Sequence, residues 1–172
     1  VIMNVLFLTL SSFNSINDRG IYSDLMRKII REGHSTYVVT PIERRLKQTT
    51  NLFQEQYCQI LRVRTLNIQK TNVIEKGIGT LLVEHQFKAA ITKYWKDVIF
   101  DIIIYSTPPI TITRLVEFIK KRDNAKTYLL LKDIFPQNAV DLGMISDHSF
   151  LHRYFRRREA ALYAISDRIG CM

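Results

Sequence analysis

The sequence predicts an α/β fold, a Rossmann-like doubly wound parallel sheet in a single domain that covers residues 1–172. Short apolar strands alternate with segments of helical spacing, and right-handed crossovers join such strands in parallel. The first unit reads as strand, loop, helix and strand. With 47% apolar residues, a chain of 172 residues can also bury a hydrophobic core, which excludes a disordered polymer.

In the first unit, a polar loop follows the first strand. Gly33 suits the position just past the end of the helix, and Pro41 closes the second strand. The predicted elements are the strand Met3–Leu10, the loop Ser11–Gly20, the helix Ile21–Glu32 and the strand Tyr37–Thr40.

The rest of the chain continues the alternation after a basic segment, Glu43–Lys47, and a polar connection. Ser106, Thr107 and the two prolines that follow supply capping hydroxyls and a start signal for a helix that runs to about Arg122. The other predicted helices are Glu75–Lys96 and Ser149–Ser166, and the predicted strands are Tyr57–Val63, Asp101–Tyr105, Thr127–Ile134 and Arg168–Met172.

Charge and cysteine content narrow the classes of function. A formal net charge of +9 favours anionic partners such as phosphates or anionic lipid. Nucleic acid is not expected, because aromatic residues do not interleave with the basic ones as a stacking platform requires. Cys58 and Cys171 are too few for a disulfide framework or a zinc site, which fits a reducing, cytoplasmic compartment. No apolar run is long enough to span a bilayer.

Candidate site residues lie where predicted strands end. Asp133 ends an apolar strand, and ligands collect at the carboxyl ends of parallel strands. The alternative is a structural cap or an ion pair, since a carboxylate there needs donors. The loop after the first strand precedes a helix N-terminus, where Asn17, Arg19 and Gly20 are candidates to hold an anion. The alternative is that this loop is a polar connection without a ligand, because Gly20 is the only glycine in it.

A nicotinamide cofactor is not expected. The first loop lacks the Gly-x-Gly-x-x-Gly pattern, and Thr40-Pro41 stands where an acid would bind the ribose hydroxyls. We therefore predict no cofactor, and the histidine spacing predicts no metal site.

Two helices carry polar residues on apolar faces. Arg158 falls in the middle of the apolar face of the last helix and needs a buried carboxylate, strand-end carbonyls or a phosphate. Arg153, Arg156 and Arg157 lie off that face, either solvated or in contact with anionic lipid.

In the long helix, His85 shares a face with three apolar residues, so we predict a core histidine rather than a catalytic base. This helix is apolar on two sides, which fits either membrane contact or packing on both sides. The three residues are Ile78, Leu81 and Leu82.

Three motifs carry a family resemblance. Leu-Lys-Asp-Ile-Phe-Pro-Gln at residues 131–137 is similar to an Arg-Asp-Leu-Trp-Pro-Glu-Ser-type segment, Gly-His-Ser-Thr-Tyr-Val-Val-Thr at 33–40 to a Gly-His-x-Val-x-Val-x-Thr strand, and Ser-Thr-Pro-Pro at 106–109 to a Ser-x-Pro-Pro turn. These segments resemble glycosyltransferase family 4 enzymes that build bacterial capsule and O-antigen sugars. The closing residues 162–172 resemble the segment that leads into a serine of that family.

The resemblance implies the N-terminal, acceptor-binding half of a retaining GT-B glycosyltransferase that needs no metal. The nucleotide-sugar donor would bind mainly to a C-terminal domain absent from this chain, so the chain alone would be inactive. Asp133 would bind an acceptor hydroxyl, and Ser106, Thr107 and Arg158 would join the substrate site. The acceptor would be a sugar on a polyprenyl diphosphate at the inner face of the cell membrane. The alternative is a non-catalytic Rossmann-like module that docks a partner subunit or anionic membrane through its basic face.

Overall fold

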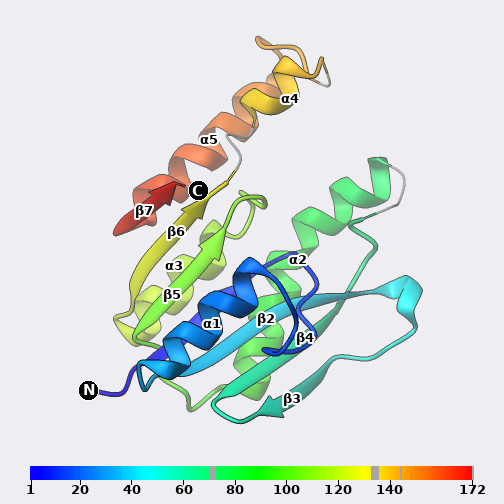
Figure 1. Ribbon diagram of the computed structural model, residues 1–172. Helices are drawn as coiled ribbons and strands as arrows, with labels where there is room; N and C mark the ends of the chain where they lie inside the picture. The colour runs from blue at the N-terminus through cyan, green and yellow to red at the C-terminus, as the bar shows by residue number, and fades with distance from the viewer. Residues whose placement is uncertain (70–72, 133–135, 144, 172) are drawn as a thin grey trace.

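The computed structural model describes residues 1–69, 73–132, 136–143 and 145–171. Seven strands form one sheet in the order β3-β4-β2-β1-β5-β6-β7 (Figure 1). Neighbouring strands are parallel except for β3, which runs antiparallel to β4. The strands are β1 (Asn4–Leu8), β2 (Ser35–Glu43), β3 (Asn51–Glu55), β4 (Cys58–Thr65), β5 (Ile102–Ser106), β6 (Lys126–Leu131) and β7 (Arg168–Cys171).

Four of the helices lie close to where the sequence predicts them, whereas the short helix Gln137–Asp141 was not predicted. The predicted end of the first helix is also confirmed, since Gly33 adopts φ of +87°, which a residue without a Cβ tolerates. The helices are α1 (Ile21–Arg31), α2 (Val73–Tyr94), α3 (Thr113–Asp123), α4 (Gln137–Asp141) and α5 (Phe150–Ile165), with a 3-10 turn at Arg44–Leu46. The predicted α/β doubly wound sheet is confirmed.

Three local predictions are wrong. Pro41 does not close β2: it pairs with Val63, at a position where β1 no longer flanks β2, so its missing N–H is tolerated. The polar connection before β4 contains strand β3. The hydroxyls of Ser106 and Thr107 do not cap α3, which begins only at Thr113; the Glu84 carboxylate accepts the Leu115 N–H instead, at 2.9 Å.

The helices divide unequally between the two faces of the sheet. Helix α1 packs alone on one face, where its Met26 contacts β1, β2 and β4 residues. Helices α2, α3 and α5 cover the other face and build the larger core (Figure 1). In this arrangement the loops after β1, β2, β4, β5 and β6 all reach the same edge of the sheet, the carboxyl edge.

Helix α2 presents a different face to the core from the one predicted. Among its described residues, the buried side chains that face the core include Val83, Glu84, Phe87, Ala90 and Ile91. His85 is exposed, so the predicted core histidine is wrong, and Ile78, Leu81 and Leu82 beside it are 41–50% exposed. At the other end of the helix, Trp95 is buried edge-on against Tyr37 and Phe100 and donates to Gln59 Oε1 at 2.7 Å.

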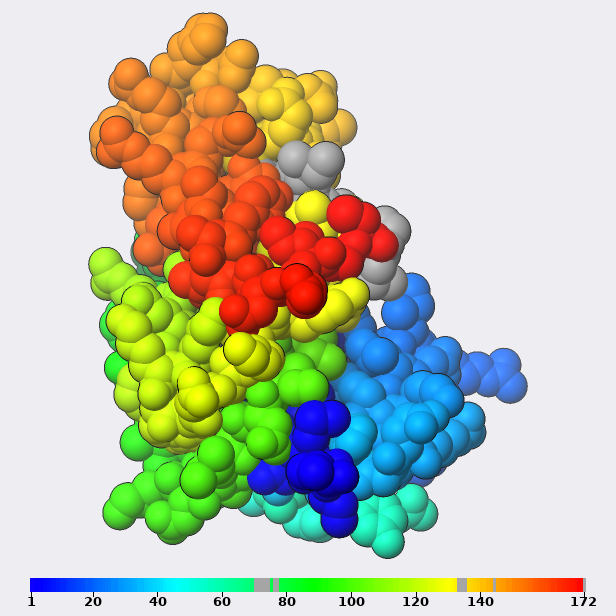
Figure 2. Space-filling view, turned by 90° about the vertical axis from the view of Figure 1, so that its left-hand side faces the viewer, coloured from blue at the N-terminus to red at the C-terminus, as the bar shows by residue number. Residues whose placement is uncertain are grey.

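Helices α4 and α5 form a projection above the body of the domain (Figure 2). Ser149 caps α5, accepting from the His152 N–H at 3.1 Å, as the predicted start requires. The second half of α5 packs on the core through Leu162, whereas Phe150 at its start is 80% exposed.

Asp167 ties the start of β7 to β6 and α3. Its carboxylate accepts from Lys120 Nζ and from the Thr127 N–H, each at 2.9 Å. The Lys120 hydrogen bond, followed by that of Thr127, lowers the pKa of Asp167 from its ordinary value of 3.8 to about 2. Because the folded pKa lies below the ordinary value, this stabilisation is present above about pH 4 and is lost as the pH falls towards 2.

We expect Asp167→Ala to lower the free energy of unfolding by about 1–2 kcal/mol at neutral pH, because the N–H of Thr127 loses its acceptor. Urea unfolding at pH 7 and at successively lower pH measures the effect, and the difference from the unchanged chain should shrink towards pH 2. Asp97→Ala, at an exposed position, is the control. A loss that is independent of pH would contradict the charge-based role of Asp167.

Candidate functional site

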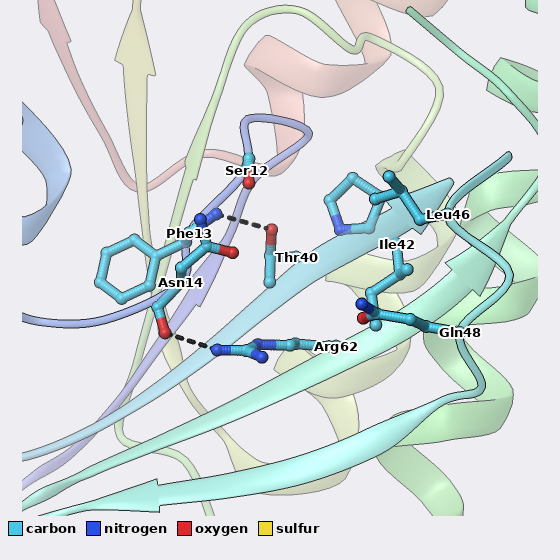
Figure 3. Close-up of a pocket in the computed structure, with 9 residues that line it drawn as sticks. Ser12, Phe13, Asn14, Thr40, Ile42, Leu46, Gln48 and Arg62 are labelled. Atoms are coloured by element: carbon cyan, nitrogen blue, oxygen red, sulfur yellow. Dashed lines mark hydrogen bonds between the residues drawn. The ribbon is translucent and has the colours of Figure 1, made fainter. Parts of the chain in front are cut away.

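A pocket opens at the carboxyl edge of the sheet, between the β1–α1 loop and the ends of β2 and β4 (Figure 3). Its volume is about 130 Å³. Polar side chains from separate segments meet apolar ones around it. The lining residues are Ser12, Phe13, Asn14, Thr40, Pro41, Ile42, Leu46, Gln48 and Arg62.

The loop that forms one wall is held by side chains from neighbouring strands. The Thr40 hydroxyl donates to the Ser11 carbonyl at 2.8 Å and accepts from the Phe13 N–H at 3.2 Å. The Glu55 carboxylate accepts from the Ser15 hydroxyl at 2.8 Å and the Ile16 N–H at 2.9 Å. The Ile16 N–H therefore already donates to Glu55 and is not free to bind a phosphate. These hydrogen bonds also fix the conformation of the loop beside the pocket.

Arg62 forms the floor of the pocket (Figure 3). Its Nη2 donates to the Asn14 carbonyl at 2.6 Å, and its guanidinium lies 5.2 Å from the centroid of the Phe53 ring. The Nε of Arg62 is buried and has no hydrogen-bond partner among the described residues. The side chain is thus held by Asn14 and Phe53, while its buried Nε–H has no acceptor among the described residues.

The loop residues predicted to bind an anion lie apart from this pocket. Asn17, Arg19 and Gly20 are exposed in the second half of the loop, and the pocket is lined by residues of its first half. Gly20 precedes α1 and offers no side-chain cap. Their predicted role in substrate binding stays a prediction.

Ser106 and Thr107 are each 2% exposed at the end of β5. The Thr107 N–H donates to the Leu130 carbonyl, and its hydroxyl accepts from the Lys132 N–H, both at 3.1 Å. Thr107 thereby continues the pairing of β5 with β6. Asp133, predicted to bind the acceptor, lies outside the described residues.

Arg158 joins helix α5 to the segment before α3. Its Nη2 donates to the Thr111 carbonyl at 3.3 Å and lies 3.8 Å from Oε2 of the buried Glu84. The partners of Arg158 are thus a carbonyl and a carboxylate, as in the structural alternative predicted from the sequence. Arg153, Arg156 and Arg157 are exposed, and Arg156 pairs with Glu159 at 2.7 Å.

Sequence reasoning missed the residues that build the pocket and its support. Arg62 lies on a strand that reads as apolar, and Gln48 lies in a connection without a motif. Glu84 lies on a helix that is apolar on two sides, so the apolar spacing does not indicate that its side chain is buried. The parallel pairing of β2 with β4 sets Thr40 opposite Arg62, which no local sequence motif indicates.

Two further features of the described residues bear on function. No three His, Cys, Asp or Glu side chains within them gather as a metal site. None of the helices, within the described ranges, is long and apolar enough to cross a membrane.

We expect Arg158→Ala to lower the free energy of unfolding by about 1–3 kcal/mol, because it removes the guanidinium that Glu84 and Thr111 face. The neighbouring exposed Arg157→Ala is the matched control and should change stability by less than about 0.5 kcal/mol. Thermal and urea unfolding compare the two. Equal stability of both variants would argue against the structural role and favour a ligand contact.

Comparison with known proteins gives similarities in sequence and in structure, whereas no protein-family model matches the chain. "Probable glycosyltransferase WbjE" of Pseudomonas aeruginosa is 23% identical over 100 residues, which cover 58% of this chain and 24% of that protein. A solved structure described as trehalose-6-phosphate from E. coli bound with UDP-2-fluoro glucose aligns with a TM-score of 0.52 and 9% identity. That alignment covers 94% of this chain and 42% of the solved chain.

The structural similarity concerns the fold, because the sequence identity is low. It covers almost the whole chain, whereas the chain spans less than half of either relative. The seven-stranded sheet with helices on both faces matches a Rossmann-like domain of the GT-B type. Together, the two similarities support a glycosyltransferase-like domain.

Proposed function

We propose that this chain is the N-terminal, acceptor-binding domain of a retaining, nucleotide-sugar-dependent glycosyltransferase of bacterial surface polysaccharide synthesis, similar to family 4. The observation that carries the proposal is the GT-B-type fold, with almost all of this chain aligned to less than half of a solved chain. The weak sequence similarity to a glycosyltransferase supports the same class. In this proposal the donor nucleotide binds mainly to a second domain.

The pocket at the carboxyl edge suits part of an acceptor sugar. Ser12, Gln48 and Arg62 offer hydrogen-bonding groups to ring hydroxyls, while Pro41 and Leu46 offer apolar surface to the ring face. Asp133, which follows β6, is assigned the acceptor hydroxyl in this proposal.

We expect the isolated chain to bind UDP- and GDP-sugars weakly or not at all, because the donor site is proposed to lie mainly outside it. Calorimetric titration with a panel of both nucleotide-sugar classes measures this directly. A micromolar dissociation constant would overturn the division into acceptor and donor domains.

The same proposal places the protein in the cytoplasm, peripherally at the inner face of the cell membrane, where a polyprenyl-diphosphate-linked acceptor is found. The α4–α5 projection supports this, because exposed apolar side chains and arginines occur together on it. Its exposed apolar residues are Leu142, Phe150, Leu151 and Tyr154, between 36% and 80% exposed. Exposed Arg153 and Arg157 follow on the same helix.

We expect the triple change of Arg153, Arg156 and Arg157 to Gln to weaken binding to anionic vesicles by tenfold or more, since each basic residue near an anionic leaflet contributes about 1 kcal/mol. Folding should be retained, because all three side chains are exposed and the buried Glu159, which pairs with Arg156, keeps its hydrogen bond from the Tyr163 hydroxyl and can accept one from a glutamine amide at position 156. Co-sedimentation with anionic and with neutral phosphatidylcholine vesicles at two salt concentrations measures the loss.

The matched control removes three exposed positive charges at or just after the C-terminal ends of α1 and α2. These are Arg31, Lys93 and Lys96. That variant should bind anionic vesicles as the unchanged chain does. Vesicle binding that does not depend on lipid charge, on salt concentration or on the three arginines of α5 would refute the membrane contact.

A further inference from the structure

No ion pair within the described ranges neutralises the charge of Arg62. Within the described residues, the neighbouring carboxylates have other partners: Glu43 pairs with Arg45 at 2.6 Å, and Glu55 accepts from the β1–α1 loop. Arg62 makes no ion pair with any described carboxylate. A guanidinium held in a pocket without a counter-charge attracts an anion.

The hydrogen bonds within the described residues also leave donors of the Arg62 guanidinium without acceptors, and this side chain lines the pocket. Nη2 is engaged with Asn14 and the guanidinium packs on Phe53, but the buried Nε has no acceptor. An arginine can hold an oxyanion through two parallel N–H donors in a fixed fork. The Phe53 and Asn14 contacts hold the side chain before any ligand arrives, which lowers the ordering cost of binding.

The rest of the pocket suits a ligand that is a sugar as well as an anion. Side chains of Ser12 and Gln48 offer hydrogen-bonding groups beside Arg62, and Pro41, Ile42 and Leu46 supply apolar surface. A volume of about 130 Å³ takes one ring or part of it, and not an extended saccharide.

We propose that this pocket recognises an acidic monosaccharide unit, and that Arg62 binds its oxyanion, a carboxylate or a phosphate. The proposal rests on the proposed acceptor-binding function and adds that the acceptor carries an acidic group. Arg62 is then the residue that discriminates an acidic sugar from a neutral one of the same shape.

The test measures chemical shifts of backbone amides in the whole chain while one probe is added at a time. The probes are glucuronate, glucose 6-phosphate, neutral glucose and inorganic phosphate. We expect one of the two acidic sugars to shift the signals of Ser12, Asn14 and Gln48 at about tenfold lower concentration than glucose, since a single charge-assisted contact is typically worth that factor. The acidic sugar that binds more tightly identifies the oxyanion.

Arg62→Gln should abolish the preference, so that acidic and neutral sugars bind equally weakly. Arg64→Gln is the matched control, because it removes the same charge two residues later on β4 without lining this pocket, and it should keep the preference. If Arg62→Gln lowers the melting temperature, Gln48→Ala provides a second variant that leaves the Asn14 contact intact. Gln48→Ala should weaken the binding of the acidic and the neutral sugar alike, so that the preference for the acidic sugar remains.

Three results would overturn the proposal: equal affinity for glucose and both acidic sugars, a preference that persists in Arg62→Gln, or no shift with any sugar. Phosphate binding as tightly as glucose 6-phosphate would also overturn it, since the pocket would then hold a free ion rather than a sugar. The nucleotide-sugar titration tests the proposed function separately. Neutral sugars binding without regard to Arg62 would leave that function standing and remove only the acidic specificity.

Discussion

The helices that cover one face of the sheet meet at a single carboxylate, that of Glu84. It accepts the Leu115 N–H at the start of α3 and faces Arg158 of α5, while its own helix, α2, packs on the strands. A carboxylate at a helix N-terminus is favoured by the helix dipole, but once buried it also requires its donors. The positions of α3 and α5 therefore depend on each other through Glu84, and with them the loop that follows β5.

The fold was predictable from the sequence because its signals are local. Apolar runs mark the parallel strands, Ser149 marks the start of α5, and Gly33 marks the end of α1. The errors arise where tertiary contacts decide. Strand β3 has exposed side chains and exists because it pairs with β4, and α2 is apolar on two sides, so spacing alone could not choose between His85 and Glu84 as the buried residue.

The candidate site was less predictable, for a physical reason. Binding motifs are recognised when residues lie close together in sequence, whereas this pocket joins the first loop to residues of β2, β4 and the connection between them. The β1–α1 loop lies at the carboxyl edge, and residues of its first half line the pocket. However, the predicted anion contacts in its second half lie away from the pocket, and the residue with an unused donor, Arg62, is on a strand that looked like core.

The β1–α1 loop also limits what this edge can bind. In nucleotide-binding Rossmann folds, backbone amides at this turn hold phosphates. Here the amides of Phe13 and Ile16 already donate to Thr40 and Glu55, so the backbone contributes few donors, and Glu55 places a negative charge where a phosphate would sit. Recognition at this edge must then come from side chains around the pocket, which suits a small hydroxylated ligand better than a nucleotide. This limit is consistent with the acceptor-binding role proposed above.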